Sequence, residues 1–263
     1  MIEAELLFSQ ILKCDRPSLY LNSKKHLSRD VSGQISAILK KRIQGEPLQY
    51  LLGNTEFMGL KFKVKPGVLI PRPETETLVE AAARYLRSLE KISGSNILDL
   101  GTGSGCIAVS LAKLFPYSRI TASDISEQAL EIARQNAKSN NVRVKFIKSE
   151  LFSDKKIRFD HYAMIVSNPP YISSDEINRL QIEISYEPRQ ALDGGRDGLN
   201  FYRRIIPQAS QYLKDKGLLI LEMGFGQHKR IENIFYKSAK FEIIEVIKDL
   251  NNINRVIIAQ KVK

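Results

Sequence analysis

Asn168, Pro169, Pro170 and Tyr171 directly follow the apolar run "AMIV", in the stretch "SNPPYI" at 167–172. Two successive prolines fix two φ angles and remove two backbone donors, so this corner is stiff and presents mainly acceptors. The Asn168 side-chain oxygen and the Pro169 carbonyl could hold the two hydrogens of a planar nitrogen and favour positive charge developing on it. Tyr171 could stack on a flat substrate group. The alternative is a proline corner with a capping asparagine.

A glycine-rich stretch, "DLGTGSG" at 99–105, lies between a short apolar strand pattern and the helical pattern "CIAVSLAKLF". Glycine allows the backbone to turn tightly and to approach a ligand closely, as Gly101, Gly103 and Gly105 would do here. The next strand pattern ends at Asp124, whose carboxylate could accept hydrogen bonds from both ribose hydroxyls of an adenosine. The loop and the acid together predict a nucleoside site.

The spacing of the glycines bears on which nucleoside is bound. A dinucleotide fingerprint places its third glycine three residues after the second, where this chain has Cys106. The carboxylate of Asp99 beside the loop would repel a pyrophosphate, whereas it suits a ligand with an ammonium group. S-adenosylmethionine carries an ammonium and a sulfonium, so we predict this cofactor. A dinucleotide and a purely structural turn are the alternatives.

The corner and the loop share one cleft if their strands are parallel, because ligands of doubly wound sheets bind outside the carboxyl ends of the strands. Asn168 would then lie beside the glycine loop and Asp124. This combination predicts transfer of a methyl group to a planar nitrogen. No strong base is needed before the attack, since the proton leaves after the nitrogen has become cationic.

The elements that position these residues alternate along the chain from residue 73 onward. Apolar strand patterns separated by amphipathic helical patterns indicate a parallel sheet covered on both faces, which is an α/β fold. The last two strand patterns have no helix between them and predict an antiparallel pair. The strand patterns span 96–101, 119–124, 143–148, 161–168, 217–224, 241–250 and 254–262.

The first part of the chain has a different pattern. Residues 1–56 are expected to form a small helical domain that docks the substrate, residues 57–72 a β-hairpin linker, and residues 73–263 the methyltransferase domain. The apolar residues expected on one side of the second helical stretch are Val31, Ile35, Ile38, Leu39 and Ile43.

Over nearly its whole length the chain resembles the release-factor glutamine methyltransferases, the PrmC or HemK family of class I S-adenosylmethionine-dependent methyltransferases. The resemblance rests on "RIQGEPLQYLLGNTEFMGLKFKV", "PGVLIPRPETETLVE", "ILDLGTGSGCIAVSLA", "SNPPYI" and "YEPRQALDGGRDGL", in this order. It implies a Rossmann-like seven-stranded methyltransferase sheet with a terminal antiparallel hairpin and an N-terminal helical bundle. It also implies methylation of the side-chain amide nitrogen (N5) of the glutamine in the Gly-Gly-Gln motif of class-1 peptide chain release factors.

The resemblance implies roles for individual residues. Asn168, Pro169 and Tyr171 would be catalytic, and together with Pro170 they would bind the substrate glutamine. Asn168 would also contact the cofactor. The other residues implied to bind the cofactor are Gly101, Thr102, Gly103, Ser104, Gly105, Asp124, Glu150 and Leu151.

Two further segments lie near these motifs. "SELF" stands where the family often has a tryptophan, so Glu150 would reach the adenine and Leu151 would offer apolar contact instead of a stacked ring. "PRPETE" opens a helix, and because helix N-termini attract anions, Thr75 or nearby amides are candidates for the methionine carboxylate. A capped helix is the alternative. The sequence assigns no role to Arg72, Glu76 and the loop at 193–198.

Other functions stay open. The tetrapeptide "NPPY" also serves methyltransferases that act on exocyclic amines of nucleic acids, although "IPRPETE" separates the chain from them. A glutamine of a ribosomal protein is a second possible acceptor. A binding module that keeps the fold without turnover is the third alternative.

Composition bears on the partners and the cellular location of the protein. The net charge of +11 on 263 residues favours an anionic partner such as nucleic acid or a ribonucleoprotein, and a lysine-rich solvated surface is the alternative. The two cysteines argue against a disulfide framework. His26, His161 and His228 are isolated, so we expect no metal. No signal peptide or membrane-spanning run is expected. We therefore expect a cytoplasmic protein with no membrane partner and no stable nucleic-acid complex.

Overall fold

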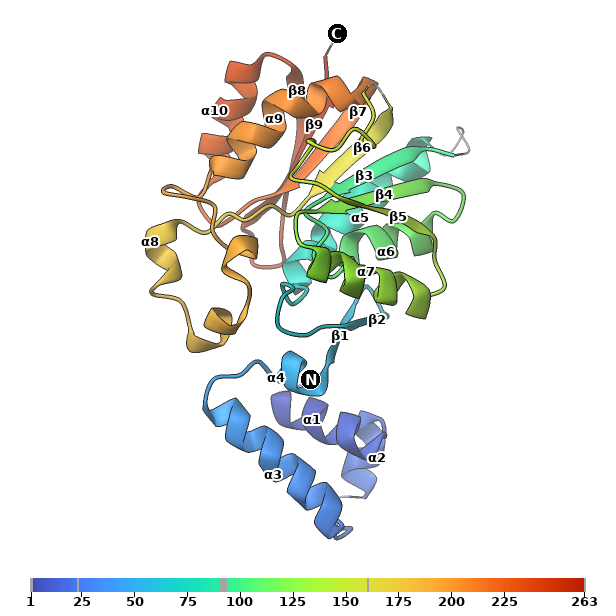
Figure 1. The fold of residues 1–263 in the computed structure, drawn as a ribbon, viewed down its shortest axis with the longest axis vertical. Helices are drawn as coiled ribbons and strands as arrows, with labels where there is room; N and C mark the ends of the chain where they lie inside the picture. The colour runs from blue at the N-terminus through green and yellow to red at the C-terminus, as the bar shows by residue number, and fades with distance from the viewer. Residues whose placement is uncertain (1, 23, 90–93, 160, 263) are drawn as a thin grey trace.

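The computed structural model describes residues 2–22, 24–89, 94–159 and 161–262. A group of helices at the N-terminus lies at one end of a larger α/β part, and a short hairpin connects the two (Figure 1). The N-terminal helices are α1 (Glu3–Leu12), α2 (Arg16–Leu21), α3 (Arg29–Ile43) and α4 (Leu48–Leu52).

The N-terminal helices share a small apolar core. Its buried residues are Leu7, Ile35 and Leu48, which come from α1, α3 and α4. The predicted one-sided apolar face of α3 is wrong for Leu39 and Ile43, which are 43% and 85% exposed. Each step of four residues turns a helix by about 40°. Leu39 and Ile43, one and two steps after Ile35, therefore leave the face that α1 and α4 cover.

A hairpin is present in this region, and it begins at Asn54 instead of at residue 57, where the linker was expected to begin. Its turn residues Met58 and Gly59 both have positive φ angles, 52° and 69°, as a two-residue hairpin turn requires. The amide of Asn136 accepts from the Lys63 N–H at 2.7 Å and donates to the Lys63 carbonyl at 3.0 Å, which fixes the hairpin on the larger part. The hairpin strands are β1 (Asn54–Phe57) and β2 (Leu60–Lys63).

The larger part is built on a seven-stranded sheet with the order β5-β4-β3-β6-β7-β9-β8. The pairs from β5 to β7 are parallel, whereas β9 pairs antiparallel with both β7 and β8. The predicted α/β fold with a terminal antiparallel pair is therefore confirmed. The strands are β3 (Asn96–Leu100), β4 (Arg119–Asp124), β5 (Val144–Lys148), β6 (Tyr162–Ser167), β7 (Leu213–Glu222), β8 (Phe241–Lys248) and β9 (Asn254–Lys261).

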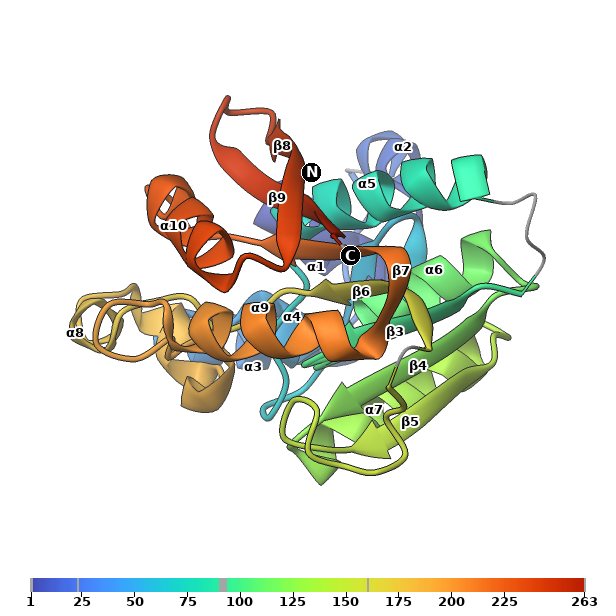
Figure 2. The same ribbon diagram turned by 90° about the horizontal axis from the view of Figure 1, so that it is seen from above.

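Helices cover both faces of the sheet (Figure 2). Alternate side chains of a strand point to opposite faces, and in β3 Ile97 packs in the core under α5 and α6 while Leu98 packs in the core under α9 and α10. Residues 168–199, here named the excursion, connect β6 to α9 and lie beside the carboxyl ends of the strands. The α-helices are α5 (Pro73–Leu89), α6 (Cys106–Leu114), α7 (Glu127–Ser139), α8 (Ser174–Ile177), α9 (Asn200–Tyr212) and α10 (His228–Ser238). Two short 3₁₀ helices, η1 (Ile182–Tyr186) and η2 (Arg189–Ala191), lie between α8 and α9.

The excursion also meets the N-terminal helices. Arg42, near the end of α3, forms an ion pair with Glu183 of η1 at 2.8 Å. The Tyr186 hydroxyl donates to the Gln44 carbonyl at 3.2 Å. The N-terminal part is thus connected to the segment that borders the site.

Candidate active site

The asparagine–proline corner lies at the carboxyl end of β6, in the middle of the sheet. The Ser167 hydroxyl donates to the Leu100 carbonyl at 2.7 Å and holds the end of β6 against β3. Beyond it, Nδ2 of Asn168 donates to the hydroxyl oxygen of Thr75 at 3.0 Å, and Thr75 is buried. This contact turns Oδ1, the acceptor end of the Asn168 amide, away from Thr75.

Two adjoining cavities meet at this corner. The first, of about 220 Å³, is lined by the glycine loop, Asp124 and Pro170. The second, of about 160 Å³, is lined by Pro169, Tyr171 and parts of the excursion. Asn168 thus stands in a wall common to both. The residues that line both cavities are Leu69, Arg72, Asn168 and Ala191.

The glycine loop leaves room for a ligand in the first cavity. Gly101 and Gly103 have φ angles of 72° and 56°, and a Cβ on either would point into open space. The Gly103 N–H donates to Oδ2 of Asp124 at 2.9 Å, and the Ser126 N–H donates to Oδ1 at 2.8 Å. Burial raises the pKa of Asp124, against the effect of these bonds. The open cradle and the acid beside it fit the nucleoside end of S-adenosylmethionine.

Gly105 and Asp99 have places that the sequence did not show. Gly105 is outside the cavity wall and packs on α7, where a Cβ would come within 3.0 Å of the Ala133 Cβ. Asp99 lies fully buried beneath the loop, where its Oδ2 accepts from the Thr102 hydroxyl at 2.6 Å and burial raises its pKa to about 7. It does not line the cavity, so the expected direct contact with a ligand ammonium is not supported.

The far end of the first cavity has both expected and unexpected residues. Glu150 and Leu151, for which the sequence predicts contact with the adenine, line it, and the Glu150 carboxylate is paired with Arg204 of α9. The sequence did not indicate Phe201 and Ile125, which add apolar surface to the same wall. Phe201 is in a helix that follows the excursion, so no local pattern connects it with the loop.

The structure gives roles to the residues of "PRPETE". Arg72 lines both cavities and forms an ion pair with the buried Glu187, which also accepts from the Ile70 N–H at 3.1 Å. Glu76 accepts from the Met58 N–H of the hairpin turn at 2.6 Å. The segment therefore connects the hairpin, through Glu76, and the excursion, through Arg72, to the site.

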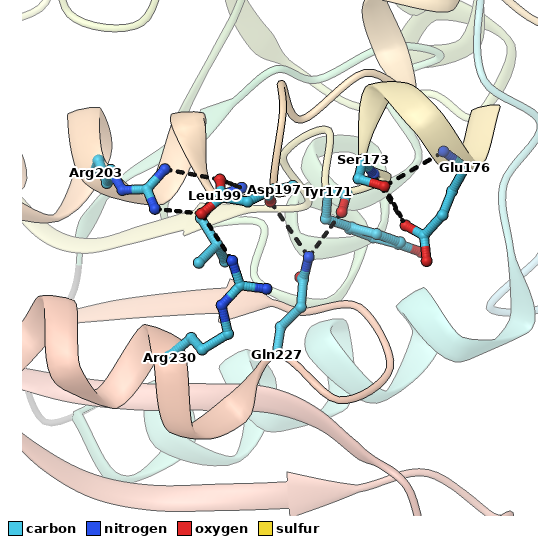
Figure 3. Close-up of polar contacts among 9 residues, drawn as sticks. Tyr171, Ser173, Glu176, Asp197, Leu199, Arg203, Gln227 and Arg230 are labelled. Carbon is cyan, nitrogen blue, oxygen red and sulfur yellow. Dashed lines mark hydrogen bonds and ion pairs between the residues drawn. The ribbon is translucent and has the colours of Figure 1, made fainter. Parts of the chain in front are cut away.

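The loop at 193–198 clamps the backbone of the corner. A Cβ on Gly198 would lie 2.3 Å from the Tyr171 carbonyl oxygen, so only glycine permits this approach. Nε2 of Gln227 donates to the carbonyls of Tyr171 and Gly198, at 2.8 and 3.3 Å. Figure 3 shows this bridge and, beside it, the carboxylate of Asp197 between Arg203 and Arg230.

Glu222, at the end of β7, is a buried acid that the sequence did not single out. Its Oε1 accepts from the Tyr171 hydroxyl at 3.5 Å. Burial raises its pKa to about 7, and the Thr75 hydroxyl acts in the opposite direction. In the sequence, Glu222 could have been found only as the acid near the end of the strand pattern "GLLILEMG".

In the described part of the chain, no helix is long and apolar enough to cross a membrane. Within the same residues, no three His, Cys, Asp or Glu side chains are grouped so that they could hold a metal ion.

This sheet order and the open glycine loop beside an acid define a class I S-adenosylmethionine-dependent methyltransferase. The methyltransferase small domain family matches residues 61–195, and the PrmC N-terminal domain matches residues 1–53. A release factor glutamine methyltransferase of Thermodesulfovibrio yellowstonii is 44% identical over 263 residues, which is 99% of this chain and 92% of that protein. The chain belongs to the release factor glutamine methyltransferase family.

Solved structures agree on the fold. The catalytic domain of hMettl16, in complex with an RNA hairpin, has a TM-score of 0.62 at 16% identity and covers 80% of each chain. The 16S rRNA N2 G1207 methyltransferase of Thermus thermophilus, in complex with AdoMet and guanosine, has a TM-score of 0.55 at 19% identity over 80% of this chain and 50% of that one. At such identities the likeness concerns the fold alone.

Proposed function

We propose that the protein transfers a methyl group from S-adenosylmethionine to the side-chain amide nitrogen of the glutamine in the Gly-Gly-Gln motif of class-1 peptide chain release factors. Family membership supports the reaction. The observation that carries the assignment of the site is that Asn168 stands in the common wall of two cavities. One cavity has the glycine loop and the other has the proline corner.

The first cavity is the proposed cofactor site. Gly101 and Gly103 would allow close approach of the ligand, and Asp124 would accept hydrogen bonds from the ribose. Leu151 and Phe201 would form the apolar wall for the adenine, with Glu150 at its edge. When bound, S-adenosylmethionine supplies an electrophilic methyl group. Thr102 and Ser104 also line this cavity, whereas Gly105, outside its wall, would shape the loop by packing on α7.

The second cavity is the proposed glutamine site. Oδ1 of Asn168 and the carbonyl of Pro169 would accept the two hydrogens of the substrate amide, while the ring of Tyr171 would confine its plane. Pro170, expected from the sequence to bind the glutamine, lines the first cavity instead. The amide lone pair is delocalised, so the nitrogen is a poor nucleophile until acceptors orient it and stabilise its developing positive charge. The surplus proton leaves after the transfer, and no strong base is required.

Thr75 has two roles in this scheme. It lines the first cavity, which supports the predicted contact with the methionine carboxylate. Its hydroxyl oxygen is already an acceptor for Asn168 at 3.0 Å, which gives it a place in orienting that amide.

The test uses purified enzyme, cofactor labelled in the methyl group and a class-1 release factor. We expect one methyl group on the glutamine of the Gly-Gly-Gln motif, located by mass spectrometry of peptides. A release factor with that glutamine changed to alanine is the matched control and should stay unlabelled. Equal labelling of the control, or labelling of RNA or a ribosomal protein in preference, would contradict the proposal. The cytoplasmic location and the absence of a stable nucleic-acid complex stay predictions.

A further inference from the structure

A fully buried carboxyl group lies directly behind the proposed glutamine site. Glu222 lines neither cavity, and its Oε2 has no hydrogen-bond partner among the described residues. A buried carboxylate without an ion pair is costly to keep. Among the described residues no cation forms an ion pair with it, and the nearby Arg255 pairs with Asp249 at 2.8 Å. Because of this cost, we infer that Glu222 has a role other than filling the core.

The contacts of Glu222 lead to both side chains of the corner. Its Oε1 accepts from the hydroxyl of Tyr171 at 3.5 Å. The hydroxyl of Thr75 is near enough to the same carboxyl to lower its pKa, as a nearby donor does. The oxygen of that hydroxyl is in turn the acceptor for Nδ2 of Asn168 at 3.0 Å.

The direction of the Thr75 hydroxyl decides which end of the Asn168 amide faces the substrate. If the hydroxyl donates to Glu222, its oxygen can accept from Nδ2, and Oδ1 is left for the substrate. If the hydroxyl donated to Asn168 instead, the amide would turn and present an NH2 group. Two donors would then face the two hydrogens of the substrate amide, and binding would fail. A charged acceptor behind Thr75 selects the first arrangement.

We propose that Glu222 is a positioning residue for methyl transfer, which orients the Thr75 hydroxyl, and through it the amide of Asn168, while it holds the hydroxyl of Tyr171. This inference rests on the proposed function of the two cavities. The acceptor strength of Oδ1 also benefits, because a hydrogen bond donated by Nδ2 polarises the amide. Glu222 touches no substrate itself.

The ionisation of Glu222 predicts a pH dependence of the turnover number, which a purely structural role of this residue would not produce. Burial, the largest cause, raises its pKa to about 7. The charged and titratable groups near it are Tyr171, Glu74, Arg255, Tyr202 and Cys106. Below that pKa the protonated group can donate to Thr75 and compete with Asn168. The turnover number should therefore rise with pH through about 7 as the carboxylate forms.

The main experiment compares the wild-type enzyme with Glu222→Gln, which keeps the shape and loses the charge. We expect kcat to fall on the order of 10²-fold, as for a small misplacement of a reacting group. The affinity for S-adenosylmethionine, measured by calorimetry, should change by less than about twofold because Glu222 lines neither cavity. The rise of kcat with pH near 7 should disappear. Asp99→Asn is the matched control, since Asp99 is also buried with a pKa of about 7 but lies under the loop, and it should keep the rise.

A second pair of variants tests the connection through Thr75. Thr75→Ser keeps a hydroxyl and should retain the pH dependence, whereas Thr75→Val should lose it and lower kcat similarly to Glu222→Gln. The double variant Thr75→Val/Glu222→Gln should be no worse than either alone, because both remove one connected chain of contacts. Additive losses, equal rates for Thr75→Ser and Thr75→Val, or a Glu222→Gln enzyme with wild-type kcat would overturn the inference. Absence of transfer by the wild-type enzyme would instead overturn the proposed function.

Discussion

The two ends of the parallel sheet differ in size, charge and enclosure. At the amino ends of the strands lies a groove of about 1480 Å³, much larger than the two cavities at the carboxyl ends. It is rich in lysine and arginine, including Arg119, Arg143, Lys145 and Arg158. Three of these cations, Arg158, Arg119 and Lys145, lower the pKa of His161 after the larger effect of burial. Among the described residues, no ion pair is formed by these four cations.

The difference shows that convergence of polar groups, rather than volume, marks the chemical site. At the carboxyl ends, backbone donors, two carboxylates and the Asn168 amide converge on enclosed space because parallel strands all end there. At the amino ends the groove is lined instead by lysine and arginine side chains that do not converge on an enclosed space. Positive charge of this kind attracts anions at long range and keeps a protein dispersed.

The strongest test of the comparison is Asn168→Ala at the carboxyl ends. Losing one preorganised group of an oxyanion hole costs about 10²–10³ in rate, and we expect a similar loss of kcat here. The affinity for S-adenosylmethionine should be largely kept, because the glycine loop and Asp124 are intact. Rates from the methylation assay and calorimetry check this, with Asn251→Ala in the exposed β8–β9 turn as control. A near-normal rate would mean that the asparagine is misassigned.

Gly198→Ala should be nearly as damaging through the backbone. The new Cβ would lie 2.3 Å from the Tyr171 carbonyl oxygen, so the corner must move, and such displacements cost up to about 10² in rate. Gly226→Ala is a closely matched control, since its φ of 74° equals that of Gly198 within a degree but nothing lies near its Cβ. Both variants should lose similar stability in thermal unfolding. If their rates also match, backbone strain rather than the clamp explains the effect.

Asp124→Ala should act mainly on the cofactor. Hydrogen bonds to charged groups contribute about 1.5–3 kcal/mol, so the affinity for S-adenosylmethionine should fall roughly 10- to 100-fold. The rate at saturating cofactor should change much less. Calorimetry and the dependence of rate on cofactor concentration separate the two effects, and the exposed Asp215→Ala serves as control. An unchanged affinity would remove Asp124 from the cofactor site.

The smallest effect is expected at the amino ends. Arg143→Glu/Lys145→Glu reverses two exposed charges in the groove, at the far end of strands roughly 17 Å long. Salt at about 0.1 M screens charges beyond roughly 10 Å, so methyl transfer should change by less than about twofold. A large loss that is restored by low salt would show that this end of the sheet helps to bind the partner.

Local patterns in the sequence were enough for the elements and for several site residues. The apolar strands, the hairpin and the terminal antiparallel pair follow from periodicity and turn residues, which act over a few neighbouring positions. The glycine loop, Asp124 and Asn168 were placed correctly in one cleft because all lie at the ends of parallel strands. The one-sided face expected for α3 failed at Leu39 and Ile43, because helical periodicity does not tell how far a partner extends.

What the sequence determined by itself was therefore the class of fold, the family and the chemical groups at the strand ends. Only the tertiary structure decided how those groups are held: Thr75 meets Asn168 across 93 positions of the chain, and Arg72 meets Glu187 across 115. It also placed Glu222 behind the corner and moved Gly105 and Asp99 out of the cavity wall. The physical reason is that such contacts depend on how helices and loops pack over the sheet, and no spacing along the chain records that packing.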